Sequence, residues 1–191
     1  MSDTLAIFHM ISEPHLSQWY ALHVKSRHEK TVHAQLQAKE QESFLPLFVA
    51  KNKWADRWKT VLLPLFPGYV FCRFNPAGRH AVLATSGILD VVRSGSEPAA
   101  IENAEIEAVQ LVVNSGVPAE PYPQLVSGQR VMLTDGPLSG LTGTLTSIRN
   151  SVRLVVSVEL LCRSILVEID RDWVVPVDIP KPPASRSLVS R

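Results

Sequence analysis

A proline-rich segment divides this chain into two parts whose hydrophobic patterns differ. The seven residues from Val117 to Pro123 include three prolines. Each proline fixes φ and removes a backbone donor, so the segment predicts a semi-rigid linker rather than a helix or a central strand. We therefore expect a linker at residues 117–126, between a first domain at 19–116 and a second domain at 127–178.

The first domain alternates strand and helix patterns, which predicts mixed α and β structure. Ser26 and Glu29 match the S-x-x-E capping box, in which Ser26 caps the helix and Glu29 reaches back to the Ser26 N–H. The helix that follows should bury Val32 and Leu36. The expected strands are residues 19–25, 45–50, 60–65, 69–74 and 88–93, and the expected helices are 26–41, 77–86 and 103–116.

The strongest strand pattern, at residues 69–74, separates apolar residues from aromatic ones. Side chains alternate between the two faces of a strand. Val70, Cys72 and Phe74 form one apolar face, which predicts core. Tyr69 and Phe71 belong to the other face, where they either form an exposed binding surface or are covered by a loop or by the second domain.

The second domain shows only strand patterns. Five short strands within about fifty residues predict a small closed β-barrel. Gly136, Gly140 and Gly143 follow the first of these strands and predict a tight loop with φ above zero at glycine. The expected strands are residues 130–133, 143–148, 154–159, 165–169 and 173–177.

Composition and motifs exclude several classes of protein. No apolar run reaches the ~20 residues that a membrane span requires. The two cysteines, Cys72 and Cys162, are too few for a disulfide framework and fit a reducing cytoplasm. No catalytic constellation, cofactor motif or metal-ligand spacing occurs, so we expect no enzyme, no cofactor and no metal site. Residues 1–18 and 179–191 lack a sustained hydrophobic period and predict a flexible leader and a disordered tail.

Charge is distributed unevenly, although the formal net charge is only +1. Residues 19–80 hold ten Lys or Arg against four acidic residues, whereas residues 81–127 hold only Arg93 against six acidic residues. The basic block predicts either a surface for a polyanion or an ordinary solvated face.

Three segments, taken in order along the chain, resemble the NusG family of transcription elongation factors. Residues 19–25 (Trp-Tyr-Ala-Leu-His-Val-Lys) and 64–71 (Pro-Leu-Phe-Pro-Gly-Tyr-Val-Phe) are similar to the NGN domain of that family. The glycine loop at 136–143 is similar to its KOW motif. The Trp-containing hairpin at 54–59 and the segment at 94–99 most resemble the specialised RfaH and UpxY antiterminator paralogues.

The resemblance implies a fold and a function. The implied fold is α+β: a ferredoxin-like α/β sandwich (NGN), the proline-rich linker and an SH3-like β-barrel (KOW). The implied function is an operon-specific transcription elongation and antitermination factor that binds RNA polymerase at the β′ clamp and suppresses pausing or termination. Such a factor is expected to be a cytoplasmic monomer without a membrane partner.

Three sets of site residues follow from the same resemblance. The clamp contacts the aromatic face, the displaced non-template DNA strand contacts the start of the first helix, and the ribosomal protein NusE or the terminator Rho contacts residues 158–163. In the last stretch, this chain has Leu161-Cys162 where housekeeping NusG has Phe-Gly. The polymerase-binding set is Trp19, Tyr20, Phe66, Tyr69 and Phe71; the DNA-binding set is Lys25, Arg27, His28 and Lys30; the KOW partner-binding set is Leu160, Leu161 and Arg163.

Two other functions stay open on the sequence. The chain is alternatively a housekeeping NusG factor that couples polymerase to Rho or the ribosome, or a KOW-type RNA-binding module. An RNA-binding module should bind RNA without polymerase, whereas an elongation factor should need the transcription complex. The β-branched runs at 152–158 and 165–169 also predict that the second domain is β, not helical, in the free protein.

Overall fold

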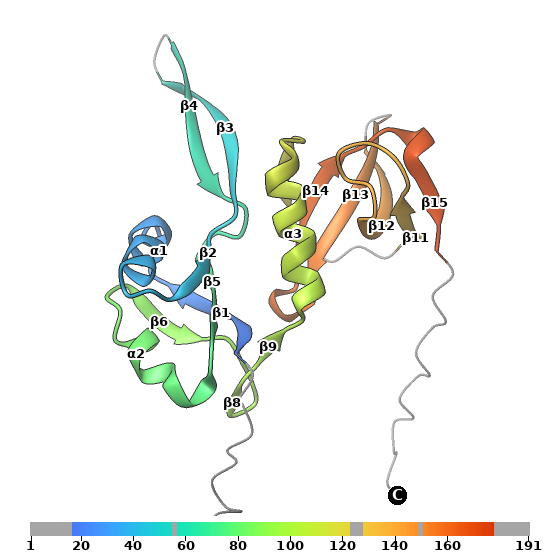
Figure 1. Ribbon diagram of the computed structural model, residues 1–191. Coiled ribbons are helices and arrows are strands. Elements are labelled where there is room, and N and C mark those ends of the chain that lie inside the picture. The colour runs from blue at the N-terminus through green and yellow to red at the C-terminus, as the bar shows by residue number, and fades with distance from the viewer. Residues whose placement is uncertain (1–16, 55–56, 123–127, 149–150, 178–191) are drawn as a thin grey trace, which may run out of the picture.

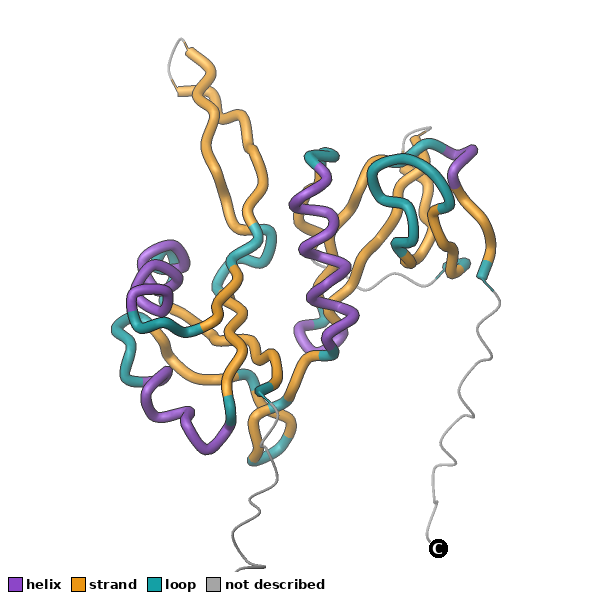
Figure 2. The backbone as a smooth tube through the Cα atoms, viewed as in Figure 1, coloured by secondary structure: helices purple, strands orange, loops and turns teal. Residues whose placement is uncertain are grey.

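Two antiparallel sheets lie on either side of a central helix, α3 (Asn103–Ser115), in the computed structural model (Figure 1). The structure describes residues 17–54, 57–122, 128–148 and 151–177. A long two-stranded hairpin projects from the first sheet, and the tube view shows that strands dominate both parts (Figure 2). None of the helices in the described ranges is long and apolar enough to cross a membrane.

The N-terminal sheet has the strand order β2-β5-β1-β6. The helices α1 (Glu29–Ala38) and α2 (Arg79–Leu83), the latter preceded by the 3-10 turn η2 (Pro76–Gly78), connect its strands in a β-α-β-β-α-β succession. This succession and order are those of the expected ferredoxin-like sandwich. The strands are β1 (Gln18–Val24), β2 (Glu42–Phe44), β5 (Tyr69–Phe74) and β6 (Ile88–Val91), with the short β9 (Ala100–Ile101) also paired to β1. A small hairpin of β7 (Arg93–Ser94) and β8 (Glu97–Pro98) follows β6.

One face of this sheet packs against α1 and α2. Val70 and Cys72 of β5 are fully buried there, and Phe74 is nearly so, as strand parity predicts. Val32 and Leu36 of α1 complete this core, so the predicted burial of both is confirmed. The other face of the sheet is therefore left for α3 and the C-terminal part of the chain.

The start of α1 differs from the capping box that the sequence predicts. His28, not Ser26, is the N-cap residue, and its side chain makes no cap hydrogen bond. Glu29 is buried, and its Oε1 accepts a hydrogen bond of 2.9 Å from the backbone N–H of Gly68. The prediction was wrong because the carboxylate joins α1 to the turn before β5 instead of reaching back along its own helix.

The projecting hairpin, which we call the arm, consists of β3 (Leu47–Trp54) and β4 (Arg57–Pro64). Among the described strands, these two pair only with each other. Their pairing continues beyond the predicted strands into the polar residues, with Lys51 opposite Thr60 and Trp54 opposite Arg57. The arm is therefore longer than the hydrophobic pattern alone predicts.

The C-terminal sheet has the order β10-β14-β13-β12-β11-β15. It contains the five expected strands and adds β10 within residues that the sequence analysis placed in the linker. Pro121 of β10 lies opposite Ile165 at the edge of the sheet, where a missing N–H donor is tolerated. The strands are β10 (Ala119–Tyr122), β11 (Arg130–Leu133), β12 (Thr142–Ile148), β13 (Ser151–Val158), β14 (Arg163–Glu168) and β15 (Val174–Pro176).

Two of the three glycines named in the sequence analysis, both in the loop between β11 and β12, have the predicted positive φ, whereas Gly143 lies in β12 and does not. Gly136 has φ of +76° and Gly140 has φ of +87°. A β-carbon at Gly136 would approach the ring of Trp173 to 2.6 Å, so this position also needs glycine for space. Trp173 belongs to the 3-10 turn η4 (Arg171–Trp173), and the loop therefore ties β11 to β15.

Candidate interaction surfaces

The second face of the N-terminal sheet gathers four of the five aromatic residues assigned to polymerase binding. Phe66 and Phe71 pack edge to face with ring centroids 5.5 Å apart, and Trp19 and Tyr69 belong to the same hydrophobic cluster. Tyr20 does not join them, because parity turns it to the α1 face, where its ring lies 4.6 Å from that of Phe74. We call Trp19, Phe66, Tyr69 and Phe71 the aromatic face.

Most of the aromatic face is buried rather than exposed. Phe71 is 0% exposed and Phe66 is 1% exposed. Ile106 and Val109 of α3 share their cluster, together with residues of the C-terminal sheet such as Val156. The face is covered because α3 and the second sheet pack over it, which is the covered alternative that the sequence left open.

Tyr69 is the half-buried member of the aromatic face and touches both sheets. Its ring lies 5.6 Å from that of His23 on β1. Arg163, on β14, approaches Tyr69 from the C-terminal sheet. Its guanidinium carbon lies 5.5 Å from the centroid of the Tyr69 ring. This distance is within the range of a cation–π contact. Tyr69 is therefore the aromatic residue at which the two sheets meet.

A cavity of about 230 Å³ lies beside this contact. The turn before β5 contributes Leu65 and Pro67, and the C-terminal sheet contributes Pro121, Tyr122, Arg163 and Ser164. The two sheets are thus incompletely packed beside Arg163. Incomplete packing lowers the cost of separating two surfaces, because fewer contacts are lost.

A polar contact joins α3 to the C-terminal sheet. The backbone N–H of Glu159 donates a hydrogen bond of 3.2 Å to Oε1 of Glu105. Burial raises the pKa of the Glu105 carboxyl above its usual value, partly offset by this hydrogen bond, and the charges of Glu159 and Glu102 raise it further. The ionised form of the Glu105 carboxyl is therefore less favourable at the junction than in water.

The residues assigned to KOW partners lie at the same junction. Within residues 158–163 the strand pairing is interrupted, because they contain the 3-10 turn η3 (Glu159–Leu161) and Cys162 with φ of +49°. Leu161 is buried and Leu160 is half-buried against the shared hydrophobic cluster. Arg163 lies over Tyr69. The structure thus brings the two candidate partner surfaces together.

The sequence analysis left coverage by the second domain as one alternative but did not assign α3 to it, although α3 carries a signal for it. Ile106, Val109 and Val112 are buried, and Ala108, Leu111 and Val113 are half-buried in the same cluster. A helix with apolar residues over so wide an arc usually packs against more than one neighbour.

The four residues assigned to DNA binding lie together at the start of α1, and we call them the basic turn. Lys25, Arg27, His28 and Lys30 are all exposed. Arg27 has φ of +65°, an unusual conformation for a residue with a side chain. The Nδ1 atom of His28 lies 3.0 Å from the backbone oxygen of Ser26. The positive end of the helix dipole adds to the field of these cations, which suits a phosphate.

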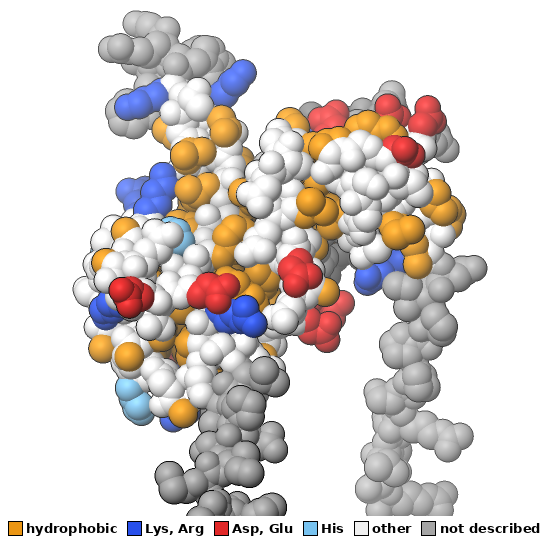
Figure 3. Space-filling model, viewed as in Figure 1, with side chains coloured by type: hydrophobic (Ala, Val, Ile, Leu, Met, Phe, Trp, Pro, Cys, Tyr) orange, Lys and Arg blue, Asp and Glu red, His pale blue; other side chains and the backbone are white. Residues whose placement is uncertain are grey.

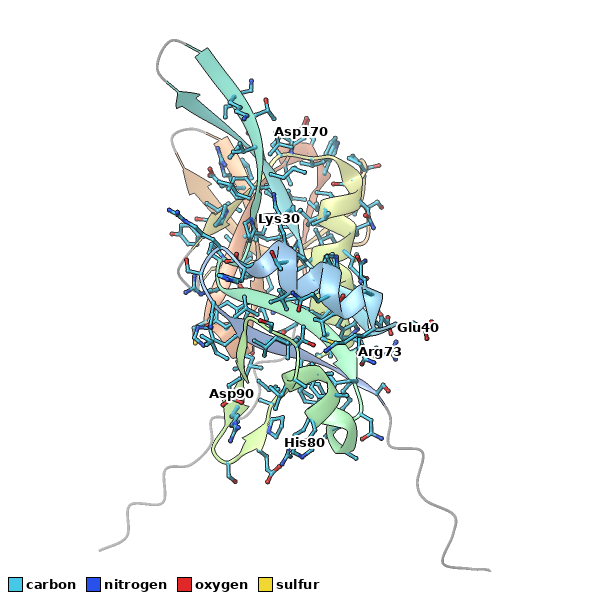
Figure 4. All side chains as sticks on the ribbon, turned by 90° about the vertical axis from the view of Figure 1, so that its left-hand side faces the viewer. Lys30, Glu40, Arg73, His80, Asp90 and Asp170 are labelled. Carbon is cyan, nitrogen blue, oxygen red and sulfur yellow. The ribbon has the colours of Figure 1, made fainter. Side chains whose placement is uncertain are left out.

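Lys30 also links the basic turn to the arm. Its Nζ donates a hydrogen bond of 2.8 Å to the backbone oxygen of Leu62 on β4. In the side view, Lys30 lies where α1 meets the lower part of the arm (Figure 4). The basic turn and the arm therefore form one continuous surface.

The cysteines and the acidic groups offer no assembled centre in the described ranges. Burial, with a contribution from Glu42, raises the pKa of the Cys72 thiol to about 12. Cys162 is exposed, and both thiols are free. No group of three His, Cys, Asp or Glu side chains that could hold a metal ion occurs among the residues that the structure describes.

Comparisons with known proteins agree with the fold. Residues 17–110 match the family model described as transcription termination factor nusG. The transcription termination/antitermination protein NusG of Rickettsia felis is 25% identical over 181 residues, spanning 83% of this chain and 90% of the relative. The protein of the same name from Thermus thermophilus is 28% identical and spans 83% of this chain and 97% of the relative. A solved structure described as domain interaction in Thermotoga maritima NusG is 19% identical, with a TM-score of 0.52 over 85% of this chain and 98% of that chain.

Proposed function

We propose that this chain, whose residues 17–110 match the NusG family model, is a transcription elongation and antitermination factor that binds RNA polymerase through its aromatic face. The observation that carries the proposal is the position of Tyr69. It is the half-buried edge of an otherwise buried aromatic cluster, and Arg163, which covers its ring, lines a cavity between the two sheets. Tyrosine is among the residue types enriched at the energetic hot spots of protein interfaces.

Polymerase and the C-terminal sheet then compete for one surface. Arg163 occupies the face of Tyr69 in the structure, so the β′ clamp reaches this ring only after the C-terminal sheet moves away. Binding steadies the clamp in its closed state, because a ligand that prefers one conformation shifts the equilibrium toward it. The basic turn contacts the displaced non-template strand at the same time.

The same movement uncovers Leu160, Leu161 and Arg163 for a second partner. We further propose that the C-terminal sheet forms an SH3-like KOW barrel. These three residues bind the second partner once the barrel is released from the aromatic face. Their engagement at the junction supports this assignment, because a surface that packs well within the chain is also suited to pack against another protein.

We assign the chain to the operon-specific antiterminators rather than the housekeeping factors. The Trp-containing arm, residues 94–99 and the Leu161-Cys162 pair support this assignment. The relatives' shared name, termination/antitermination protein NusG, favours the housekeeping factor as the second candidate. Mapping the transcripts that the chain occupies in cells separates the two, because an operon-specific factor occupies few transcripts and a housekeeping factor occupies most.

Binding of purified RNA polymerase to the full-length chain tests the central proposal. Tyr69→Ala should weaken binding by roughly thirtyfold, the effect of losing about 2 kcal/mol at an aromatic anchor. Leu89→Ala is the matched control, because Leu89 is an exposed apolar residue of β6 that belongs to neither core cluster. Normal polymerase binding by a folded Tyr69→Ala protein would show that the clamp does not use this face. Tight RNA binding without polymerase would favour the KOW-type RNA-binding module.

A further inference from the structure

The arm exposes apolar side chains that no other described strand covers. Val49 is 62% exposed and lies opposite Leu62, which is 48% exposed, while Leu63 on the other face is 38% exposed. These three are half of the large exposed hydrophobic residues in the described ranges. An isolated two-stranded hairpin is only marginally stable in water, so an arm of this kind is expected to gain a partner.

Cations dominate the outer half of the arm. Lys51, Lys53, Arg57 and Lys59 stand in its sequence against a single acidic residue, Asp56. The side chains of Lys51 and Lys59 are exposed. The space-filling view shows basic side chains on both sides of the arm toward its tip, with hydrophobic side chains along its stem (Figure 3). The partner is therefore expected to be an anion with an extended surface.

The basic surface does not end at the arm. The hydrogen bond from Lys30 to the Leu62 backbone connects the stem of β4 to the basic turn. Glu29, the acidic residue of that turn, is buried and accepts a hydrogen bond from Gly68. Exposed cations thus extend from Lys25 through Lys30 to Lys51 and Lys59 on the arm.

We propose that the arm binds double-stranded DNA, extending the single-strand contact of the basic turn onto the adjoining duplex. Three of the four arm cations are lysines, which are depleted in protein interfaces and common at phosphates. A two-stranded β-ribbon fits the major groove. Eight-residue strands extend about 26 Å, roughly three-quarters of a turn of B-DNA. The exposed Val49 and Leu62 then contact thymine methyl groups and sugars in the groove.

Fluorescence anisotropy of a 24-base-pair DNA duplex with the full-length chain tests this assignment without polymerase. The chain should bind the duplex at about 50 mM salt, and Lys51→Gln with Lys59→Gln should weaken binding about tenfold. The log–log salt slope should fall by about 1.8, because each lost phosphate contact contributes about 0.9. The matched control is Arg79→Gln with Arg130→Gln, which removes two exposed cations on α2 and β11 and should leave the slope near that of the wild type.

A single-stranded DNA of the same length separates the arm from the basic turn. Lys25→Gln with Arg27→Gln should affect single-strand binding more than duplex binding, and the arm variant should show the reverse order. Unchanged duplex affinity in an arm variant that melts like the wild type would overturn the proposal. A loss of duplex affinity in the control variant as large as that in the arm variant would also overturn it. Weaker polymerase binding by the arm variant with unchanged duplex binding would assign the arm to a protein instead. Because no polymerase is present in the duplex experiment, a failed clamp assignment leaves its outcome unaffected.

Discussion

The guanidinium of Arg163 lies over the ring of Tyr69, with 5.5 Å between the guanidinium carbon and the ring centroid. One residue comes from the C-terminal sheet and the other from the N-terminal sheet, and each belongs to a different candidate binding surface. The pair therefore joins the two candidate surfaces. A contact of this kind is worth about 0.5–1 kcal/mol where it is partly exposed, which is small enough for a competing partner to displace.

Removing the arginine should favour the open arrangement. Arg163→Ala should raise the affinity for RNA polymerase by about two- to fivefold, because the variant loses about 0.5–1 kcal/mol of the contact that polymerase must break. Arg130→Ala is the control, since Arg130 is an exposed cation of β11 in the same sheet. Lower polymerase affinity in Arg163→Ala would show that Arg163 contacts polymerase directly rather than shielding Tyr69.

The two aromatic residues of β5 should differ in their effect on stability. Phe71 is 0% exposed, so Phe71→Ala should cost about 3–5 kcal/mol and lower the melting temperature by roughly 6–20 °C. Tyr69→Ala should cost much less, because Tyr69 is only half-buried. Thermal melting followed by circular dichroism measures both. A Phe71→Ala protein as stable as the wild type would mean that α3 and the C-terminal sheet do not stay packed over the aromatic face in solution.

Much of the N-terminal domain could be predicted because its strands and helices follow from patterns among residues close in sequence. Strand 69–74 alternates apolar and aromatic residues, and its two faces join separate clusters as predicted. Val32 and Leu36 are spaced by one helical turn and are buried together. Gly116 ends α3 with φ of +71°, where the sequence places the end of that helix.

The junction could not be predicted because it depends on contacts distant in sequence. The Tyr69–Arg163 contact joins residues on opposite sides of the linker, and neither residue carries a local signal for the other. Glu29 fits a capping box locally, yet its carboxylate accepts a hydrogen bond from the backbone N–H of Gly68. Pro121 indicated a linker, but an edge strand accepts proline when its N–H side needs no partner.

The charge on Glu105 makes the junction sensitive to pH. Its pKa is raised above 4.5 in the structure, so its contribution to stability is greatest below that pH and is lost as the pH rises through the raised value. Glu105→Gln keeps an oxygen that accepts the Glu159 N–H and removes the charge. The variant should melt about 2 °C above the wild type at pH 7–8, and the difference should shrink toward pH 4. A difference that stays constant from pH 4 to pH 8 would assign the effect to something other than ionisation.

The two positive-φ glycines of the β11–β12 loop should respond differently to alanine. A β-carbon at Gly136 would meet the Trp173 ring at 2.6–2.8 Å, whereas one at Gly140 would meet nothing within 4 Å. Gly140→Ala should therefore cost only the conformational strain, about 1 kcal/mol. Gly136→Ala should cost more, because the ring must also move. Equal melting temperatures for the two variants would show that η4 shifts without cost.

The unusual backbone of Arg27 predicts that replacing this residue by glycine stabilises the fold but weakens nucleic-acid binding. Arg27 has φ of +65°, which costs a residue with a side chain about 1 kcal/mol and costs glycine almost nothing. Arg27→Gly should therefore raise the melting temperature by about 1–2 °C, since the greater chain entropy of glycine offsets part of the gain. It should also weaken binding of single-stranded DNA and lower the log–log salt slope by about 0.7.

Glu40→Gly provides the matched control for this substitution. Glu40 also has positive φ, at +58°, and lies just beyond the other end of α1 (Figure 4). Its replacement should give a similar gain in melting temperature without any loss of DNA affinity. If Arg27→Gly stabilised the chain and bound single-stranded DNA as tightly as Glu40→Gly, the positive φ of Arg27 would have no connection with nucleic acid. If both lost affinity equally, the loss would come from a change in α1 itself, because Arg27 belongs to the basic turn and Glu40 does not.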